Sequence, residues 1–583
     1  MRGDENFWAK AGVRPVSRRA ILGAGAVGAG IAGIGAIGCG GGAKSGTSQR
    51  GATAPSGAAS SASNSGLSAG SFKTGGTLQL QLNSIIALDP YYSSSFITDQ
   101  LAGHSYSRLF RFVAGTDPNQ FLSHQIAPDL VDTYEIAGDN TTYTLKLKRN
   151  AMFHPPLSRP LTSADVMASW QRLTADPKSV NGSVFKPLVD SLTAPDDYTV
   201  VFKLKAPYAP FLNKLTSPTY LWVISRDAAD GKIDPSKQPV GTGPWIFVNS
   251  SPTAYTYRKN PDYYVKGIPY ADGAVLNVML DYAPREAQFQ AGKLDVDQWA
   301  VVDVDAMKKA VPKAHVVSYN DVYSQQLWFS DVSLPSSPFH DLRLRQAASL
   351  ALDRKGLLDI GYNGQGAWSN FVNPGLGKWW LDPQGKEIGD VGKWFKHDVA
   401  QARQLLNASG NANTEFKFLY ANNGYAEPFN TLADAARGML ADAGFKLTVV
   451  TVDYNKDYMN SGQGIFYKGP PPNTIVYAPE TRFADPDDYL FGWLTPEGNR
   501  NHSHVDDPTL TALIKKEQAE LDENKRLDLV KQVQKAADEL MYYAPAIGQI
   551  RYDAYQPWID NPVVSYEYSF GLERHAYLSI NRT

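Results

Sequence analysis

The chain of 583 residues is longer than one ordinary hydrophobic core requires, so two or more lobes are expected. Its content of 43% apolar and 20% charged residues is typical of a globular protein, and its formal net charge of −2 gives no sign of a nucleic-acid or anionic-membrane partner. The single cysteine excludes an intrachain disulfide and a cysteine-rich metal cluster.

The first 39 residues have the pattern of an export signal. Arg18 and Arg19 form a twin-arginine start, and an uncharged run rich in Gly, Ala and Ile extends from Ala20 to Gly38. A basic start, an apolar stretch and small residues before a cut site are typical of a secretory signal. The run is long enough to span a bilayer, so a retained anchor is the alternative, although its glycines make it a weak membrane helix.

Cys39 ends this signal, and residues 36–39 resemble a bacterial lipobox, which implies lipidation of Cys39 at the mature N-terminus. Ala36 stands where leucine is usual. Residues 40–72 are mostly Gly, Ser, Ala and Thr, a composition typical of a flexible tether. We expect the mature chain in the periplasm or on the outer face of the cytoplasmic membrane of a prokaryote. A lipid anchor would be its only membrane contact.

Strands and amphipathic helices alternate after the tether. Residues 75–82 and 142–148 alternate apolar and polar side chains, which predicts strands. Thr162, with Asp165 three residues later, predicts a capped helix start. Further helices are expected over 285–292 and 432–444 and from Asp341, Asp398, Asp507 and about Asp522, with further strands over 276–280 and 446–452. This alternation favours an α/β fold.

The run Pro239–Trp245, Pro-Val-Gly-Thr-Gly-Pro-Trp, is the most distinctive motif of the chain. Gly241 and Gly243 flank a threonine, which predicts a tight turn that uses the φ freedom of glycine. Residues 246–248 and 255–257 follow as the strands of a predicted hairpin. The loop lacks the Lys-Ser/Thr of a P-loop and the spacing of a dinucleotide fingerprint, which argues against nucleotide binding.

Together with Asn-Pro-Asp-Tyr at 260–263, this motif resembles the P-x-G-T-G-P-[YW] … N-P-x-Y signature of the extracytoplasmic solute-binding proteins of peptide and nickel ABC importers, solute-binding protein family 5. The stretches 161–166 and 339–354 also match family signatures. The resemblance implies an α/β, two-lobed periplasmic-binding-protein fold of class II, cluster C type, with an inserted subdomain and a hinge between the lobes. It implies no cofactor.

The resemblance also divides the mature chain. Lobe 1 is expected over residues 73–323, with the inserted subdomain at about 106–230, and lobe 2 over 324–541. The C-terminal segment, 542–583, is expected to return to lobe 1. The chain then crosses between the lobes more than once, an arrangement that suits a hinge.

Two stretches are expected to contact the solute. The residues after the family's G-x-x-D nominate Gln298 and Trp299, and a core position is the alternative for Trp299. A lobe 2 segment at 477–489 corresponds to another lining loop of the family. It nominates Tyr477, Glu480, Arg482 and Asp485.

Arg482 stands four residues before Pro486, where peptide-binding relatives carry an aspartate that pairs with the peptide's α-ammonium. An arginine would repel an ammonium and favour carboxylate, phosphate or stacked sugar groups. A shift that puts Glu480 in the aspartate's role would restore capture of a peptide N-terminus. A surface salt bridge of Arg482 is the third alternative.

Solute binding is favoured over two other classes of function. A secreted hydrolase lacks a nucleophile elbow, a His-Glu-x-x-His motif and a spare cysteine, and a surface adhesion protein lacks repeats. The resemblance implies capture of an oligopeptide or related solute, or alternatively an oligosaccharide or metal chelate, for an ABC permease and its ATPase subunits. His502 and His504 lie in a turn, where solvated polar residues are usual, so no metal site is expected. We expect a monomer without nucleic-acid partners.

Overall fold

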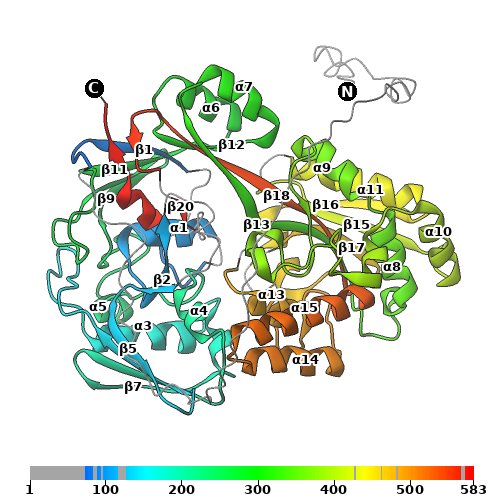
Figure 1. The fold of residues 1–583 in the computed structure, drawn as a ribbon, viewed down its shortest axis with the longest axis horizontal. Coiled ribbons are helices and arrows are strands. Elements are labelled where there is room, and N and C mark those ends of the chain that lie inside the picture. The colour runs from blue at the N-terminus through cyan, green and yellow to red at the C-terminus, as the bar shows by residue number, and fades with distance from the viewer. Residues whose placement is uncertain are drawn as a thin grey trace, which may run out of the picture. The chain divides into compact units, whose positions relative to one another are not determined.

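The structure, a computed structural model, describes residues 72–82, 88–93, 96–115, 126–425, 428–460, 463–480, 483–562, 564–565 and 572–582. The predicted signal with Cys39, nearly all of the tether, and Arg482 lie outside this part. In the described chain, helices and strands surround two hydrophobic cores (Figure 1). Every helix described here is too short or too polar to cross a bilayer.

Two four-stranded sheets share the first core. One has the order β1-β11-β10-β9, with β1 parallel to β11 and the remaining pairs antiparallel. Its strands are β1 (Thr77–Leu82), β9 (Trp245–Ser251), β10 (Ala254–Lys259) and β11 (Gly273–Val278). The other is antiparallel, with the order β5-β6-β8-β7: β5 (Val131–Ile136), β6 (Thr142–Leu147), β7 (Val189–Asp196) and β8 (Thr199–Leu204). The predicted strands over 75–82 and 142–148 and the predicted hairpin are confirmed.

Short helices cover these sheets. The helices of this part are α1 (Phe96–Ser105), α3 (Ser163–Ala175), α4 (Phe211–Thr216) and α5 (Arg226–Ala229). The predicted start of α3 is confirmed, because the Thr162 N–H donates to the Asp165 carboxylate at 2.9 Å. Residues 106–230, the expected inserted subdomain, contribute to the same continuous core as β1 and β11.

The loop at Gly241 requires glycines for a different reason from the one that the sequence predicts. Neither Gly241 nor Gly243 has a positive φ angle, so φ freedom is not what the loop requires. A Cβ at Gly241 would instead lie 2.0 Å from the Ser105 carbonyl oxygen, and one at Gly243 would lie 2.6 Å from that of His104. The two glycines therefore allow the loop to pack against the last turn of α1.

A seven-stranded mixed sheet runs through the second core. Its order is β12-β18-β13-β17-β15-β16, and β14 pairs with β18 beside this path. The strands are β12 (Val296–Trp299), β13 (His315–Phe329), β14 (Ala367–Trp368), β15 (Glu415–Ala421), β16 (Lys446–Val452), β17 (Thr474–Pro479) and β18 (Tyr543–Tyr555). The predicted strand over 446–452 is confirmed as β16.

Amphipathic helices pack around this sheet (Figure 1). They are α6 (Tyr282–Gln290), α7 (Val304–Ala310), α8 (Leu342–Ala351), α9 (Arg354–Tyr362), α10 (Val399–Ala408), α11 (Phe429–Asp442), α12 (Ile465–Lys468), α13 (Pro486–Leu494), α14 (Pro508–Ala519) and α15 (Glu523–Leu540). Side-chain caps at Asp341, Asp398, Asp507 and Asp522 confirm the predicted starts of α8, α10, α14 and α15.

Short elements complete the described chain. Three two-stranded pairs join β2 (Phe110–Phe112) to β4 (Ile126–Pro128), β3 (Ala114–Gly115) to β20 (Val564–Ser565), and β19 (Ile559–Asp560) to β21 (Ser579–Ile580). Short helical segments, which are 3₁₀ helices except for the π-helical η7, occur at η2 (Gly182–Phe185), η3 (Val301–Asp303), η4 (Pro338–His340), η5 (Pro374–Trp379), η6 (Gly389–Phe395), η7 (Tyr454–Tyr458) and η8 (Leu572–Tyr577).

The two long strands β13 and β18 lead from one core to the other. They pair antiparallel from His315 opposite Tyr555 to Trp328 opposite Tyr543. Val317 packs against both cores, and Tyr555 belongs to the first. The expected lobe boundary at residue 324 thus falls inside β13. Phe289, Leu294 and Trp299 already pack in the second core, whereas Val296 packs in the first.

Replacing Gly241 with alanine should destabilise the fold by about 1–3 kcal/mol, because the added methyl has no space beside the Ser105 carbonyl. Chemical denaturation measures this difference. Gly438, in the interior of α11, has no atom within 4 Å of an added Cβ, so Gly438→Ala is the matched control and should leave stability unchanged or raise it. Equal stability of the two variants would contradict the packing explanation.

Candidate functional site

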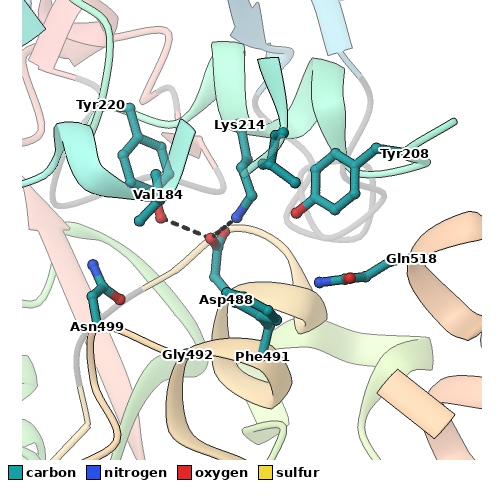
Figure 2. Close-up of a pocket in the computed structure, with 10 residues that line it drawn as sticks. Val184, Tyr208, Lys214, Tyr220, Asp488, Phe491, Gly492, Asn499 and Gln518 are labelled. Carbon is teal, nitrogen blue, oxygen red and sulfur yellow. Dashed lines mark hydrogen bonds and ion pairs between the residues drawn. The ribbon is translucent and has the colours of Figure 1, made fainter. Parts of the chain in front are cut away.

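A small pocket lies where α4 of the first core meets α13 and α14 of the second (Figure 2). The side chains lining it include Tyr208, Lys214 and Tyr220 from the first part and Asp488 and Gln518 from the second. Its free volume of about 10 Å³ holds roughly one water molecule. The pocket is therefore a contact between the two parts, and it is too small to admit a solute.

Lys214 is the centre of this contact. Its ammonium lies 2.5 Å from Asp488 and 3.5 Å from Asp487, and all three side chains are buried. Figure 2 shows Lys214 and the Tyr220 hydroxyl converging on Asp488, with Tyr220 at 2.7 Å. Burial favours a neutral lysine, but Asp488, together with Tyr208, Tyr220 and Asp487, outweighs it and holds the pKa of Lys214 well above its usual range. We call Lys214, Asp487 and Asp488 the lysine clasp.

Asp485 supports the clasp from the start of α13. Its carboxylate caps the helix by accepting the Asp487 N–H at 2.9 Å, and it forms an ion pair with Arg526 at 2.5 Å. It also accepts a hydrogen bond from Asn213, which comes from α4. Asp485, a predicted solute contact, thus has both carboxylate oxygens occupied by protein groups.

Tyr477 and Glu480 lie on opposite faces of the seven-stranded sheet. Tyr477 is paired with Leu327, and its hydroxyl bonds to Gln325. Because side chains alternate along a strand, Glu480 shares the other face with Gln326. The sheet therefore separates two residues that the sequence nominates for one site.

Glu480 has a buried carboxylate with no cationic partner among the described residues. It is 5% exposed, and its Oε2 atom has no hydrogen-bond partner. Gln326 can satisfy the other oxygen, in the amide orientation that puts its nitrogen 3.2 Å from Oε1 and its oxygen 3.3 Å from Trp328 Nε1. Burial raises the pKa of Glu480 well above its usual range, although the nearby Asn373 amide opposes this effect. Asn373 also bonds to Tyr489 at 2.9 Å.

Aromatic rings line the face that carries Glu480. His502 stacks on Trp328, with ring centroids 4.0 Å apart and planes 8° from parallel. Phe466 and Trp493 contact His502 at centroid distances of 4.8 and 4.9 Å. We call Trp328, Phe466, Trp493 and His502 the aromatic wall. Two polar atoms of the wall, Trp493 Nε1 and His502 Nε2, are buried and have no hydrogen-bond partner in the part of the chain that the structure describes.

Strand β12 contains Gln298 and Trp299, the other two predicted solute contacts, and Arg285 contacts this strand. Arg285 Nη2 donates to the Gln298 carbonyl at 2.6 Å, and its Nε lies 2.9 Å from Asp297 Oδ1 without the alignment of a hydrogen bond. Trp299 is 1% exposed and packs edge-on against Phe289 in the second core. Trp299 therefore lies in a core position, which is one of the two positions that the sequence allows for it.

His502 and His504, for which the sequence predicts no role as metal ligands, both contact other side chains of the protein. His502 belongs to the aromatic wall, and burial, helped by the charge of Arg500, lowers its pKa well below the usual range. His504 lies 2.7 Å from Asp331. Among the described residues, no group of three or more His, Cys, Asp or Glu side chains has the arrangement of a metal site.

Sequence reasoning missed Lys214 and the aromatic wall. Lys214 lies inside the short helix α4, and no local pattern distinguishes it from the other basic residues of the chain. The wall comes from four separate segments, so only the fold brings its rings together. The sequence did contain a signal that Glu480 and Tyr477 do not share one site. They are three residues apart, and in an extended segment side chains an odd number of residues apart point to opposite faces.

Asp297 predicts a pH dependence of stability. Its pKa is raised to about 6 by burial, against the opposing charge of Arg285. A carboxyl whose pKa is higher in the folded than in the unfolded state stabilises the fold at low pH, and this contribution is lost as the pH rises through 6. Compared with Asp297→Asn, the wild type should lose about 2–3 kcal/mol of relative stability between pH 4 and pH 7 in denaturant titrations. The exposed Asp190→Asn is the control, and a pH-independent difference for Asp297→Asn would contradict the assignment.

The chain is similar to several known binding proteins. It is 24% identical over 491 residues to di/tripeptide-binding protein 2 of Pseudomonas aeruginosa, covering 79% of this chain and 87% of that protein. It is 25% identical over 488 residues to heme-binding protein A of Haemophilus influenzae, covering 79% and 84%. The structure of the ABC transporter-associated periplasmic binding protein DppA from Helicobacter pylori, in complex with the peptide STSA, superposes with a TM-score of 0.72 at 19% identity, covering 88% and 99%.

These likenesses agree with the fold described above, in which β13 and β18 connect two α/β lobes. The family described as bacterial extracellular solute-binding proteins, family 5, matches residues 125–501, which is more than half of the chain. The chain therefore belongs to the bacterial extracellular solute-binding proteins of family 5.

Proposed function

We propose that this chain, the substrate-binding component of an ABC importer, captures short peptides through their protonated amino terminus, and that Glu480 accepts this ammonium. The observation that carries the proposal is the Glu480 carboxylate, which is buried beside a free hydrogen-bonding position and has no cation in the described chain.

The surroundings of Glu480 suit an ammonium ligand. A buried carboxylate without a counter-charge is unfavourable unless it becomes neutral or acquires a cation. An ammonium carries three donors, and both Glu480 Oε2 and Ser324 Oγ are buried without a partner. The Glu480 N–H donates to the Ser324 carbonyl at 2.8 Å, so the two residues lie opposite each other on neighbouring backbone segments. The aromatic wall, connected to Glu480 through Gln326, supplies apolar surface for a side chain.

The relatives support a peptide solute more than the oligosaccharide or metal-chelate alternative. Among the similar proteins, di/tripeptide-binding, dipeptide-binding and glutathione-binding proteins recur. The structures of similar fold include complexes with the peptide STSA and with Met-Leu. Glu480 stands two residues before Arg482, so it can provide the negative charge that the arginine position lacks.

The lysine clasp gives the closed arrangement of the lobes its stability. Tyr208, Asn213, Lys214 and Tyr220 of the first part all bond to the acidic start of α13. Breaking a buried ion pair leaves uncompensated charges and costs about 3–5 kcal/mol. We infer that the lobes close on the solute, that the clasp forms on closure, and that the closed form is presented to the permease and its ATPase subunits.

We also propose a role for residues 1–72, the predicted export signal and tether. A twin-arginine signal ending at Cys39, lipidation of Cys39 and the Gly/Ser/Ala tether would hold a monomeric binding protein at the outer face of the membrane. The tether would leave the lobes free to reach the permease. This role assigns the chain no catalytic step.

The Glu480 proposal predicts a requirement for a free amine. A pool of di- to pentapeptides should raise the melting temperature of the protein, and the same pool after N-acetylation should not. Glu480→Gln should weaken binding of the free pool at least tenfold, since it removes the charge that pairs with the ammonium. Because the pKa of Glu480 is raised in the empty protein, binding should release a proton and tighten from pH 6 to pH 7.5 in calorimetry.

Asp538→Asn is the matched control for this experiment. Asp538 is another buried carboxyl whose pKa is raised by burial, and its partner is Asn370 at 3.1 Å. The control should lose stability while keeping its preference for free amines. Equal binding of the free and acetylated pools by the wild type would overturn the role of Glu480, and absence of any shift with the free pool would overturn the peptide proposal.

The clasp predicts that Lys214→Met opens the protein. The variant leaves Asp487 and Asp488 buried without their cation, so the closed arrangement should lose about 3–5 kcal/mol and the radius of gyration in solution scattering should rise. Lys237→Met, which removes the exposed pair with Asp234, is the matched control and should change neither quantity. Identical scattering curves for the two variants would show that the clasp does not hold the lobes together.

A further inference from the structure

The buried charges around the start of α13 are unequal in number. In the part of the chain that the structure describes, this cluster contains four buried carboxyl groups and three buried cationic side chains: Asp485, Asp487, Asp488 and Glu517, and Lys214, Arg500 and Arg526. If all of these groups are ionised, one negative charge is left without a counter-charge in a buried place. Such a charge is unfavourable, and the uptake of one proton by a carboxylate removes it.

Three of the carboxyl groups have surroundings that favour the ionised form. Asp485 caps α13, and Asp487 and Asp488 lie in its first turn, where the positive end of the helix dipole stabilises negative charge. Each of them also accepts hydrogen bonds from side chains. Asp487 accepts from Gln518 at 2.6 Å and from Tyr208, and the donors to the other two are described above. These three groups therefore have reasons to remain charged.

Glu517 is in the opposite situation. It is 0% exposed and lies in the last turn of α14, where the negative end of the helix dipole disfavours a carboxylate. Its Oε2 atom accepts from Arg526 Nε at 2.9 Å, but Arg526 also pairs with Asp485 at 2.5 Å. The Glu517 Oε1 atom is buried without a hydrogen-bond partner among the described residues. Burial raises the pKa of Glu517 well above its usual range, against the charge of Arg526 and together with the charges of Asp487 and Asp485.

The first lobe covers the place where Glu517 is buried. The Ala209 N–H donates to the carbonyl of Gln518, the neighbour of Glu517, at 2.8 Å. The Tyr208 hydroxyl bonds to Asp487, and Tyr208 and Gln518 both line the small pocket between the lobes (Figure 2). Separation of the lobes would remove these contacts and admit water to the cluster, which lowers the cost of ionising a carboxyl group.

We propose that Glu517 holds a proton when the lobes are closed and releases it when they separate, so that acid favours the closed form. The inference rests on the closure of the lobes proposed above. A carboxyl group whose pKa is higher in the closed form stabilises that form below the usual pKa range of a glutamate, and this contribution is lost as the pH rises through the raised value. For one proton, the closing equilibrium constant changes by at most about tenfold per pH unit.

Asp488 is the alternative holder of the proton. Burial raises its pKa as well, and its Oδ2 atom has no hydrogen-bond partner among the described residues. However, its other oxygen accepts from Lys214 at 2.5 Å and from Tyr220 at 2.7 Å, and the charge of Arg500 also acts on it. If Asp488 held the proton, removing the Glu517 carboxyl group would leave the pH dependence unchanged.

The test measures unfolding in denaturant for two pairs of proteins without solute: wild type with Glu517→Gln, and Lys214→Met with the double variant. In the first pair, the folding equilibrium constant of the wild type relative to that of Glu517→Gln should fall at least about tenfold from pH 5.5 to pH 8.0, because only the wild type loses a proton. In the second pair, whose lobes are open, this ratio should change less than about twofold. Glu497→Gln, which removes an exposed carboxyl group 3.8 Å from Lys515, is the matched control and should follow the wild type at both pH values.

A constant ratio in the first pair would overturn the protonation of Glu517. An equal fall in both pairs would show that the second lobe holds the proton by itself, which would overturn the link to closure. If Glu517→Gln does not fold, the stability lost in Lys214→Met decides: it should decrease from pH 5.5 to pH 8.0, and a constant or increasing loss would overturn the proposal. Because no solute is added, failure of the peptide proposal would leave these results unchanged, whereas failure of lobe closure would appear in the scattering of Lys214→Met.

Discussion

The register of strand β13 determines which side chains can meet in the second lobe. Alternation along the strand separates Gln325 from Gln326, and pairing with β17 then places Glu480 with Gln326 and Tyr477 with Gln325. A slip of one residue would exchange the two faces and bury a different set of groups against the aromatic wall. On its other edge, β13 pairs with β18, the second strand that leads between the cores. One hydrogen-bonded ladder therefore sets both the composition of the candidate site and the connection of the lobes.

The buried charges of this protein fall into two groups, and the difference between them points to the solute. Most have an evident partner within the chain: Lys214 has two aspartates, Arg526 has Asp485 and Glu517, and Arg345 and Arg354 have backbone carbonyls. Among the described residues, Glu480 lacks such a partner, and it connects to the aromatic wall through Gln326. Because a buried carboxylate without a counter-charge is unfavourable, the proposed ligand is one that brings a cation to it. The lysine clasp joins the two lobes, and in the proposed mechanism it forms when they close on such a ligand.

Much of the secondary structure could be predicted from the sequence, because its signals are local. The caps at Asp341, Asp398, Asp507 and Asp522 and the alternation in β1 and β6 needed only a few neighbouring residues. Gly241 shows the limit: the sequence indicated a special loop, but the reason, close packing against α1, depends on residues more than a hundred positions away. Lys214 and Arg500 could not be singled out, because the significance of a basic residue depends on whether the fold supplies it with acceptors. Trp299 was open to two interpretations for the same reason, and its burial in the second core is a property of the fold.

A crystal structure of the protein grown with the di- to pentapeptide pool would show where the ammonium of a bound peptide lies. We expect a peptide enclosed between the lobes, with its terminal ammonium within hydrogen-bond distance of the Glu480 carboxylate and the Lys214–Asp488 ion pair intact. A bound peptide whose ammonium meets a different acidic residue, with Glu480 still buried and unpaired, would contradict it.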